Sequence, residues 1–338
     1  MTALAVGLAA VLATSGCLGV PPMPSTSVPA GGPLAGKKIP VSIVTVDGTH
    51  PRPVVQVSVA GGPTVPMLLD SGSIGLRMFA KSVGDSGIKT SGTQEHALFG
   101  DGTVFNGTRA EAPAVIGGMP TAGSIQFEVV KNVGCMAEQP NCPGLHDAAG
   151  YTSDQRVDGI VGIGLNSAPV FNPLLQLDGG IPSTYTVSLG STSGTIAFGS
   201  PPNSPVAAFP MQASADERQS NGAPAWNDQS IQGCWAFGSP QQSQCLNTTF
   251  DTGSVLTTAS TSVPGAPPPP FAPDGLPLSL ATSAGGTPLW SFTSGSTAGK
   301  NQVSITNSPT PILISGIAAF REFAITYDLP DGKVILAH

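Results

Sequence analysis

Residues 65–73 read VPMLLDSGS, and residues 245–254 read CLNTTFDTGS. In both stretches a predicted strand runs into an aspartate, Asp70 or Asp251, which is followed by a small hydroxyl residue and a glycine. A glycine-containing apolar run comes after each of them, at residues 158–164 and 312–317. This loose duplication predicts two similar lobes, each of which offers one carboxylate at a turn, with a site between the lobes.

The composition is typical of an all-β protein. The 338 residues include 43 glycines and 34 prolines, and 40% of the chain is hydrophobic. Turn residues interrupt short apolar or alternating runs every few positions, as in β-meanders of sandwiches and barrels. These runs are residues 41–46, 54–59, 67–69, 114–116 and 125–130. We therefore expect an all-β fold with only short helical pieces, such as residues 318–324.

The charge pattern excludes several classes of protein. Only 10% of the residues are charged, the net charge is −7, and no run of Lys or Arg is longer than two residues. Nucleic acid and an anionic membrane surface are therefore not expected as main partners. The sequence also lacks the motifs of serine hydrolases with a Gly-x-Ser-x-Gly turn, of His-Glu-x-x-His zinc enzymes and of P-loop proteins.

The odd number of cysteines indicates that one of the five has a separate role. Cys17 ends an apolar run, and the stretch LATSGC at residues 12–17 resembles a bacterial lipobox, in which the cysteine is lipidated after cleavage behind Gly16. An ordinary secretory signal or an uncleaved N-terminal anchor are the alternatives. We expect an exported protein, either a lipoprotein of the cell envelope or a secreted protein. Membrane attachment is expected only through the lipid at Cys17.

The other four cysteines form two local groups and allow three pairings. We predict disulfides Cys135–Cys142 and Cys234–Cys245, because this pairing closes the shortest loops. A zinc site would require tighter pairs with nearby histidines, and only His146 lies close, so no metal is expected.

The chain divides into four predicted parts. We expect a signal segment with a lipobox, a tether rich in Pro, Gly and Ser, an N-terminal lobe and a C-terminal lobe. Their predicted boundaries are 1–17, 18–36, 37–202 and 203–338.

The two aspartate turns suggest a specific chemistry. Glycine lets the backbone turn tightly and bring its N–H groups close to each carboxylate. The first hydroxyls, Ser71 and Thr252, can bond to the backbone of the opposite lobe, and Ser73 and Ser254 can donate to the outer carboxylate oxygens. Two carboxyls about 3 Å apart cannot both ionise and so share one proton. A water between them is then deprotonated by one aspartate while the other polarises a substrate carbonyl.

With these turns, other landmarks occur in an order that resembles the pepsin family of aspartic peptidases. Residues 99–103 (FGDGT) resemble its flap hairpin, and residues 158–162 (DGIVG) resemble its Asp-Gly-Ile-Leu-Gly strand. Residues 184–199 resemble the hairpin that closes the first lobe, and residues 314–334 resemble the last strands of the second. The Gly- and Pro-rich style and the lipobox further resemble exported aspartic peptidases of mycobacteria and related actinobacteria.

This resemblance implies a bilobal fold of two β-barrel-like lobes with an active-site cleft between them. It assigns catalysis to Asp70 and Asp251 and makes the chain an aspartic endopeptidase that cleaves extended peptides or proteins. The flap that closes over the substrate comprises Phe99, Gly100, Asp101 and Gly102. No metal or organic cofactor is implied, and we expect a monomer.

Three positions depart from the family pattern. Phe99 replaces the flap tyrosine, Arg77 replaces the tryptophan that partners it, and Ile317 replaces an aspartate in the second lobe. We interpret the first two as a modified flap that retains catalysis. The alternative is a weak or inactive pepsin-fold protein that binds partners at the cell surface.

Asp101 carries a prediction about specificity. An aspartate at this flap position resembles fungal relatives that accept lysine just before the scissile bond. We therefore predict cleavage after Lys as well as after large apolar residues; the alternative is a solvated aspartate at a hairpin tip.

Overall fold

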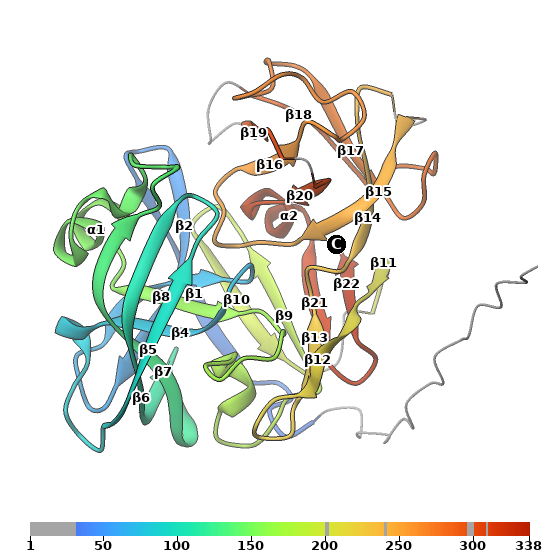
Figure 1. Ribbon diagram of the computed structural model, residues 1–338. Coiled ribbons are helices and arrows are strands. Elements are labelled where there is room, and N and C mark those ends of the chain that lie inside the picture. Colours follow the sequence, from blue (N-terminus) through green and yellow to red (C-terminus); the bar gives the residue numbers. More distant parts are fainter. Residues whose placement is uncertain (1–31, 200–202, 240–241, 296–300, 309) are drawn as a thin grey trace, which may run out of the picture.

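The computed structural model describes residues 32–199, 203–239, 242–295, 301–308 and 310–338. Cys17 and the predicted signal segment lie outside these residues. Most of the regular secondary structure of the described chain consists of strands (Figure 1). The strands of the first half are β1 (Lys38–Val46), β2 (His50–Val59), β3 (Val65–Asp70), β4 (Ile74–Phe79), β5 (Lys89–Leu98), β6 (Thr103–Ile116), β7 (Met119–Cys135), β8 (Gly159–Ile163), β9 (Thr184–Leu189) and β10 (Ser193–Phe198).

The second half continues in the same manner. Its strands are β11 (Pro205–Pro210), β12 (Gln212–Arg218), β13 (Pro224–Asn227), β14 (Gln232–Phe237), β15 (Gln244–Thr249), β16 (Thr257–Ser260), β17 (Pro277–Ala281), β18 (Trp290–Thr293), β19 (Val303–Thr306), β20 (Ile312–Ile314), β21 (Ala324–Asp328) and β22 (Lys333–Ala337). The helices are α1 (Ala148–Gln155) and α2 (Ile317–Glu322), and short 3-10 helices occur at Ala80–Ser82, Pro143–Leu145 and Pro173–Gln176. The predicted all-β fold is confirmed.

The duplication seen in the sequence is a duplication of strand topology. In the first half β3 pairs parallel with β8, β8 antiparallel with β4, and β4 parallel with β7. In the second half β15, β20, β16 and β19 repeat this order of parallel, antiparallel and parallel pairs. Each half therefore carries its aspartate just after, or at the end of, a strand that pairs in parallel with a later strand, β8 or β20.

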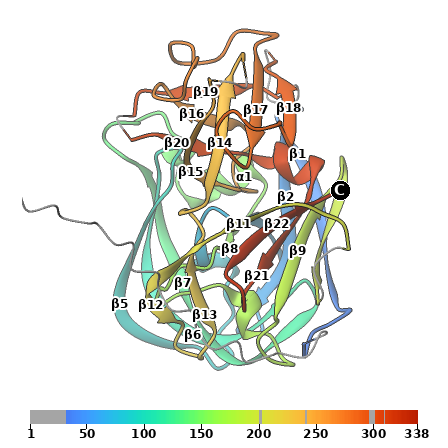
Figure 2. The same ribbon diagram turned by 90° about the vertical axis from the view of Figure 1, so that its right-hand side faces the viewer.

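A shared sheet joins the two halves. The 13-stranded sheet runs from β11 through β22, β21, β9 and β10 to β1, so strands from the end of the chain lie beside strands of the first half (Figure 2). The remaining strands of the second half form a separate seven-stranded sheet and a two-stranded sheet of β12 and β13. The two lobes are thus connected by backbone hydrogen bonds as well as by side chains.

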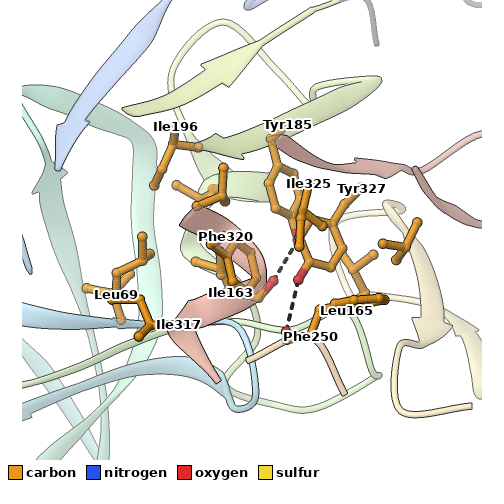
Figure 3. Packing of buried hydrophobic residues seen from close by; sticks show 14 of the residues in the cluster. Leu69, Ile163, Leu165, Tyr185, Ile196, Phe250, Ile317, Phe320, Ile325 and Tyr327 are labelled. Atoms are coloured by element: carbon orange, nitrogen blue, oxygen red, sulfur yellow. Dashed lines mark hydrogen bonds between the residues drawn. The ribbon is translucent and has the colours of Figure 1, made fainter. Parts of the chain in front are cut away.

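Two tyrosines of this shared sheet bond to backbone carbonyls close to the aspartate turns. Tyr185 of β9 and Tyr327 of β21 are cross-strand partners whose rings stack with centroids 4.8 Å apart. The Tyr185 hydroxyl donates to the Ile163 carbonyl at 2.7 Å, and the Tyr327 hydroxyl donates to the Phe250 carbonyl at 3.3 Å (Figure 3). Because Phe250 precedes Asp251 and Ile163 ends β8, the sheet holds the strand ends of both lobes.

Two local features differ from the sequence-based expectations. Helix α1 was not predicted, because its sequence AAGYTSDQ has no amphipathic period; the Asp147 side chain caps it by accepting the Gly150 N–H at 2.9 Å. The end of the predicted tether is also ordered against the first lobe. Leu34 is only 2% exposed in the core, and the Gly36 N–H donates to the Phe198 carbonyl.

The predicted disulfide pairing is confirmed, since Cys135 is bonded to Cys142 and Cys234 to Cys245. Disulfides are typical of exported proteins. Among the described residues, no helix has both the length and the apolar character needed to cross a membrane.

Candidate active site

The two aspartate turns meet face to face where the lobes join. A Cβ atom added at Gly72 would lie 2.5 Å from the Asp251 Cγ, and one added at Gly253 would lie 2.6 Å from the Asp70 Cγ. Each glycine thus leaves space that the opposite carboxyl fills. Both turns require a residue without a side chain, because any Cβ would overlap the other lobe's aspartate.

Ser71 and Thr252 tie the turns together through four reciprocal hydrogen bonds. The Ser71 N–H donates to the Thr252 Oγ1 at 3.0 Å, and the Thr252 N–H donates to the Ser71 Oγ at 2.9 Å. Each hydroxyl in turn donates to the other lobe's backbone: Ser71 to the Phe250 carbonyl at 2.8 Å and Thr252 to the Leu69 carbonyl at 2.7 Å. Both side chains are buried, so these bonds fix the distance between the turns with little competition from water.

The two carboxyls have different surroundings. Asp70 is 6% exposed and accepts the Gly72 N–H at 2.8 Å and the Ser73 hydroxyl at 2.5 Å. The pKa of Asp251 lies well above its usual value, first because of burial and then because of the charge of Asp70 and a hydrogen bond with it. The Gly253 and Ser254 N–H groups act in the opposite direction on this pKa. The surroundings of Asp251 therefore favour its protonated form.

Ser254 does not have the role predicted from the sequence. Its hydroxyl donates to the Leu256 carbonyl at 2.8 Å rather than to the outer oxygen of Asp251, so only its backbone N–H serves the carboxyl. Ser73 does donate to Asp70. The difference arises from the chain after the turn, where the Leu256 carbonyl lies within reach of the serine hydroxyl.

Comparison with known proteins agrees with this geometry. A model of the PE-PGRS C-terminal aspartyl peptidase-like domain matches residues 37–329. The chain belongs to this family. An aspartic proteinase from Irpex lacteus, known from a crystal structure, is similar with a TM-score of 0.55 over 89% of this chain and 97% of that chain, at 16% identity. No curated protein matches the sequence.

The predicted resemblance to pepsin-like peptidases and the predicted bilobal fold are thus confirmed. The likeness to the Irpex lacteus proteinase extends over nearly the whole of that chain, although the sequences have diverged widely. At this identity the likeness concerns the fold alone.

The predicted flap residues, 99–102, lie at the turn between β5 and β6. Gly102 has φ +88°, a conformation that glycine adopts without strain, and the Asp101 carboxylate accepts the Thr103 N–H at 2.9 Å. The Phe99 ring packs edge-on against Phe105 with centroids 5.0 Å apart. Phe105 in turn contacts Phe79 and Tyr151 of α1. The Phe99 side chain therefore packs against an aromatic cluster.

Arg77, which stands in place of the family's tryptophan, forms a buried ion pair instead of an aromatic contact. Its Nη1 donates to the Glu128 carboxylate of β7 at 2.6 Å, and the Glu128 side chain has no exposed surface. Burial raises the pKa of Glu128, and Arg77 opposes this rise. The Arg77 side chain therefore anchors β4 to β7 beneath the flap strands. Ile317, at the third departure, is buried, and its N–H donates to the Ser254 carbonyl at 2.8 Å.

Three side chains near the dyad were missed by sequence reasoning. Asp228, which follows β13, is buried and accepts the Leu165 N–H at 2.8 Å; burial raises its pKa to about 7, and the charge of Asp70 adds to the rise. Arg52 of β2 and Gln229 reach the turns from opposite lobes. No motif marks these residues, because their partners are distant in the chain.

The described residues also contain no cluster of three or more His, Cys, Asp or Glu side chains that could hold a metal ion.

Proposed function

We propose that this protein is an aspartic endopeptidase. The observation that supports this most strongly is the pair of turns. Each turn places its aspartate carboxyl against the glycine of the other turn, where a Cβ atom would overlap the carboxyl. In the proposed reaction, Asp70 takes a proton from a water molecule while the water oxygen attacks the peptide carbonyl carbon. Asp251 gives its proton to the carbonyl oxygen. Asp70 then passes its proton to the amide nitrogen while Asp251 takes a proton back from a hydroxyl of the tetrahedral intermediate. The C–N bond breaks, the acid and amine products leave, and Asp251 again holds the single proton of the pair.

We propose an extended polypeptide as the substrate. The β5–β6 hairpin carries the flap turn, and a peptide added as a strand could bond to the backbone there, at Gly100 and Asp101. Closure of the flap would exclude water from the reacting groups. We propose that the protein acts as a monomer and without a cofactor.

The decisive experiment compares purified protein with Asp70→Asn and Asp251→Asn in a peptide-cleavage assay across pH. We expect cleavage that a pepstatin-like transition-state mimic blocks, and a loss of at least about a thousandfold in either variant. Proteolysis that survives in a variant would refute the dyad assignment. A folded wild-type protein that cleaves nothing at any pH would favour the alternative, an inactive pepsin-fold binding protein of the cell surface.

We propose that Asp101 adds a preference for Lys just before the scissile bond. Its side chain is exposed at the flap tip while Oδ1 accepts the Thr103 N–H. Asp101→Asn keeps an acceptor for this N–H and removes only the charge, whereas Asp101→Ala removes both. Profiling with a peptide library should show that both variants lose cleavage after Lys and keep cleavage after large apolar residues. Unchanged cleavage after Lys would reject the idea.

We also propose that the protein is exported and attached to the cell envelope by a lipid on Cys17, as the lipobox resemblance suggests. Incorporation of labelled fatty acid should be seen in the wild-type chain and be absent from Cys17→Ser. If the wild-type chain takes up no label and appears in the medium, the secreted alternative holds.

A further inference from the structure

Each catalytic turn receives a side chain from the opposite lobe on its glycine carbonyl. Arg52 of β2, in the first lobe, donates from Nη1 to the Gly253 carbonyl at 3.0 Å. Gln229, in the second lobe, donates from Nε2 to the Gly72 carbonyl at 3.4 Å. The two contacts occupy equivalent places, but only the one on the Asp251 turn carries a charge.

Arg52 is held firmly in this position. Its Nη2 donates to the Gln155 Oε1 at the end of α1 at 2.8 Å, and its Nε is buried without a hydrogen-bond partner. A partly desolvated guanidinium interacts more strongly with nearby charges than one in water. The arginine thus links β2, α1 and the turn of the other lobe.

The contact reaches Asp251 through a single peptide group. The Gly253 carbonyl and the Ser254 N–H belong to the same peptide, and this N–H bonds to the Asp251 carboxyl. A cation at the oxygen polarises the peptide and strengthens the N–H as a donor. The Gly253 N–H also donates to Asp251 Oδ1, at 2.7 Å. Negative charge on Asp251 is therefore stabilised through the backbone.

We propose that Arg52 is a positioning residue that acts on Asp251 through the Gly253–Ser254 peptide and sets the pH range over which the pair of aspartates holds one proton. This inference rests on the proposed function and adds the control of its pH dependence. Gln229 is the neutral counterpart on the Asp70 turn.

Other titratable groups act on the pair in the opposite sense. Asp70 faces Asp251 directly, Asp228 in the segment after β13 interacts with the charge of Asp70, and Tyr327 of β21 interacts with the charges of both aspartates. Ionisation of any of these three would disfavour a second negative charge at the site. Arg52 offsets them with a positive charge.

The first test measures kcat/KM against pH for the wild type, Arg52→Gln, Arg52→Lys and Gln229→Leu. Arg52→Gln retains a donor but loses the charge. We expect both limbs of its bell-shaped profile to shift to higher pH by about 0.5 to 1 pH unit. Arg52→Lys restores the positive charge, so its limbs should lie closer to those of the wild type by at least half of this shift. Gln229→Leu is the matched control, since it removes a donor from the other turn but no charge, and its limbs should not move.

The inference is overturned if the limbs of Arg52→Gln coincide with those of the wild type, or if Gln229→Leu shifts them equally. Should Arg52→Gln fail to fold, Gln229→Arg tests the same effect from the other turn, and its limbs should move down by a similar amount. Limbs that do not move down in Gln229→Arg would then overturn the inference.

A second measurement does not depend on activity. Titration of the aspartate carboxyl carbons by NMR, with Asp251→Asn to identify the signals, should show the pair ionising at higher pH in Arg52→Gln than in the wild type. If the wild type proves inactive, the proposed function fails, while this titration still decides the role of Arg52. Identical titration curves would reject that role.

Discussion

Gly72 and Gly253 show most clearly why a particular residue is required at a particular place. We predict that Gly72→Ala lowers kcat by at least about a hundredfold, because its Cβ would lie 2.5 Å from the Asp251 Cγ and would displace that carboxyl. Gly123→Ala is a suitable control, since a Cβ there meets nothing within 4 Å. Full activity in Gly72→Ala, measured as initial rates on a peptide substrate, would contradict the proposed approach of the two carboxyls.

Asp228 gives a prediction about stability. Its raised pKa, about 7, means that the folded protein holds a proton that the unfolded chain releases near pH 4. The stabilisation from this proton is full below pH 4 and is lost as the pH rises to 7 and above. Asp228→Asn keeps the acceptor for the Leu165 N–H and does not titrate.

In urea unfolding at several pH values, the free energy of unfolding of the wild type should fall relative to Asp228→Asn by up to about 4 kcal/mol between pH 4 and pH 8. Parallel curves for the two proteins over this range would show that Asp228 is not buried as described.

The hairpin that carries the flap is supported by an element behind it. Thr103 pairs with Cys135 across β6 and β7, the Met136 N–H donates to the Gly102 carbonyl at 2.8 Å, and Gln139 packs against Gly102. The disulfide Cys135–Cys142 closes this short loop. The flap turn therefore rests on a cross-linked loop rather than projecting freely.

Replacing both cysteines of this loop by serine should cost about 2 kcal/mol of stability and raise KM more than it lowers kcat, because the substrate must order a looser flap. The comparison is the double replacement of Cys234 and Cys245, whose disulfide joins β14 to β15. If both pairs affect KM equally in steady-state kinetics, the loop does not support the flap.

The elements were predictable to different degrees. Strands with strong apolar or alternating patterns, such as β2 and β7, were evident because side chains alternate between the two faces of a sheet. Helix α1 was not, since eight residues without an apolar face depend on a cap and on Tyr151 packing against Phe79 and Phe105. A capping residue alone is too weak a sequence signal to predict this helix without knowledge of the residues that pack against it.

At the scale of the whole molecule, the junction of the lobes depends on Ser71 and Thr252. We predict that Ser71→Ala and Thr252→Val each destabilise the protein by about 2 to 3 kcal/mol, because buried backbone groups lose their partners. The double variant should cost less than the sum, by at least about 0.5 kcal/mol, since the four bonds are shared.

Thermal or urea unfolding measures this coupling. Ser167→Ala is the control: Ser167 bonds to Ser214 at another contact between the halves, shares no partner with Ser71, and should combine with Ser71→Ala additively. Additivity of Ser71→Ala with Thr252→Val would contradict the reciprocal arrangement.

The sequence by itself determined the repeated strand-and-turn units, the pairing of the cysteines and the residues at each aspartate turn, because these depend on contacts between near neighbours and on the small size of glycine. Only the tertiary structure decided the rest of the site. The hydroxyl of Ser254 bonds away from Asp251, and Arg52, Asp228 and Gln229 reach the turns from strands or loops that lie far off in the chain. Hydrogen bonds between such distant segments leave no periodic pattern, and burial, which sets the proton balance of the pair, exists only once the lobes have closed on each other.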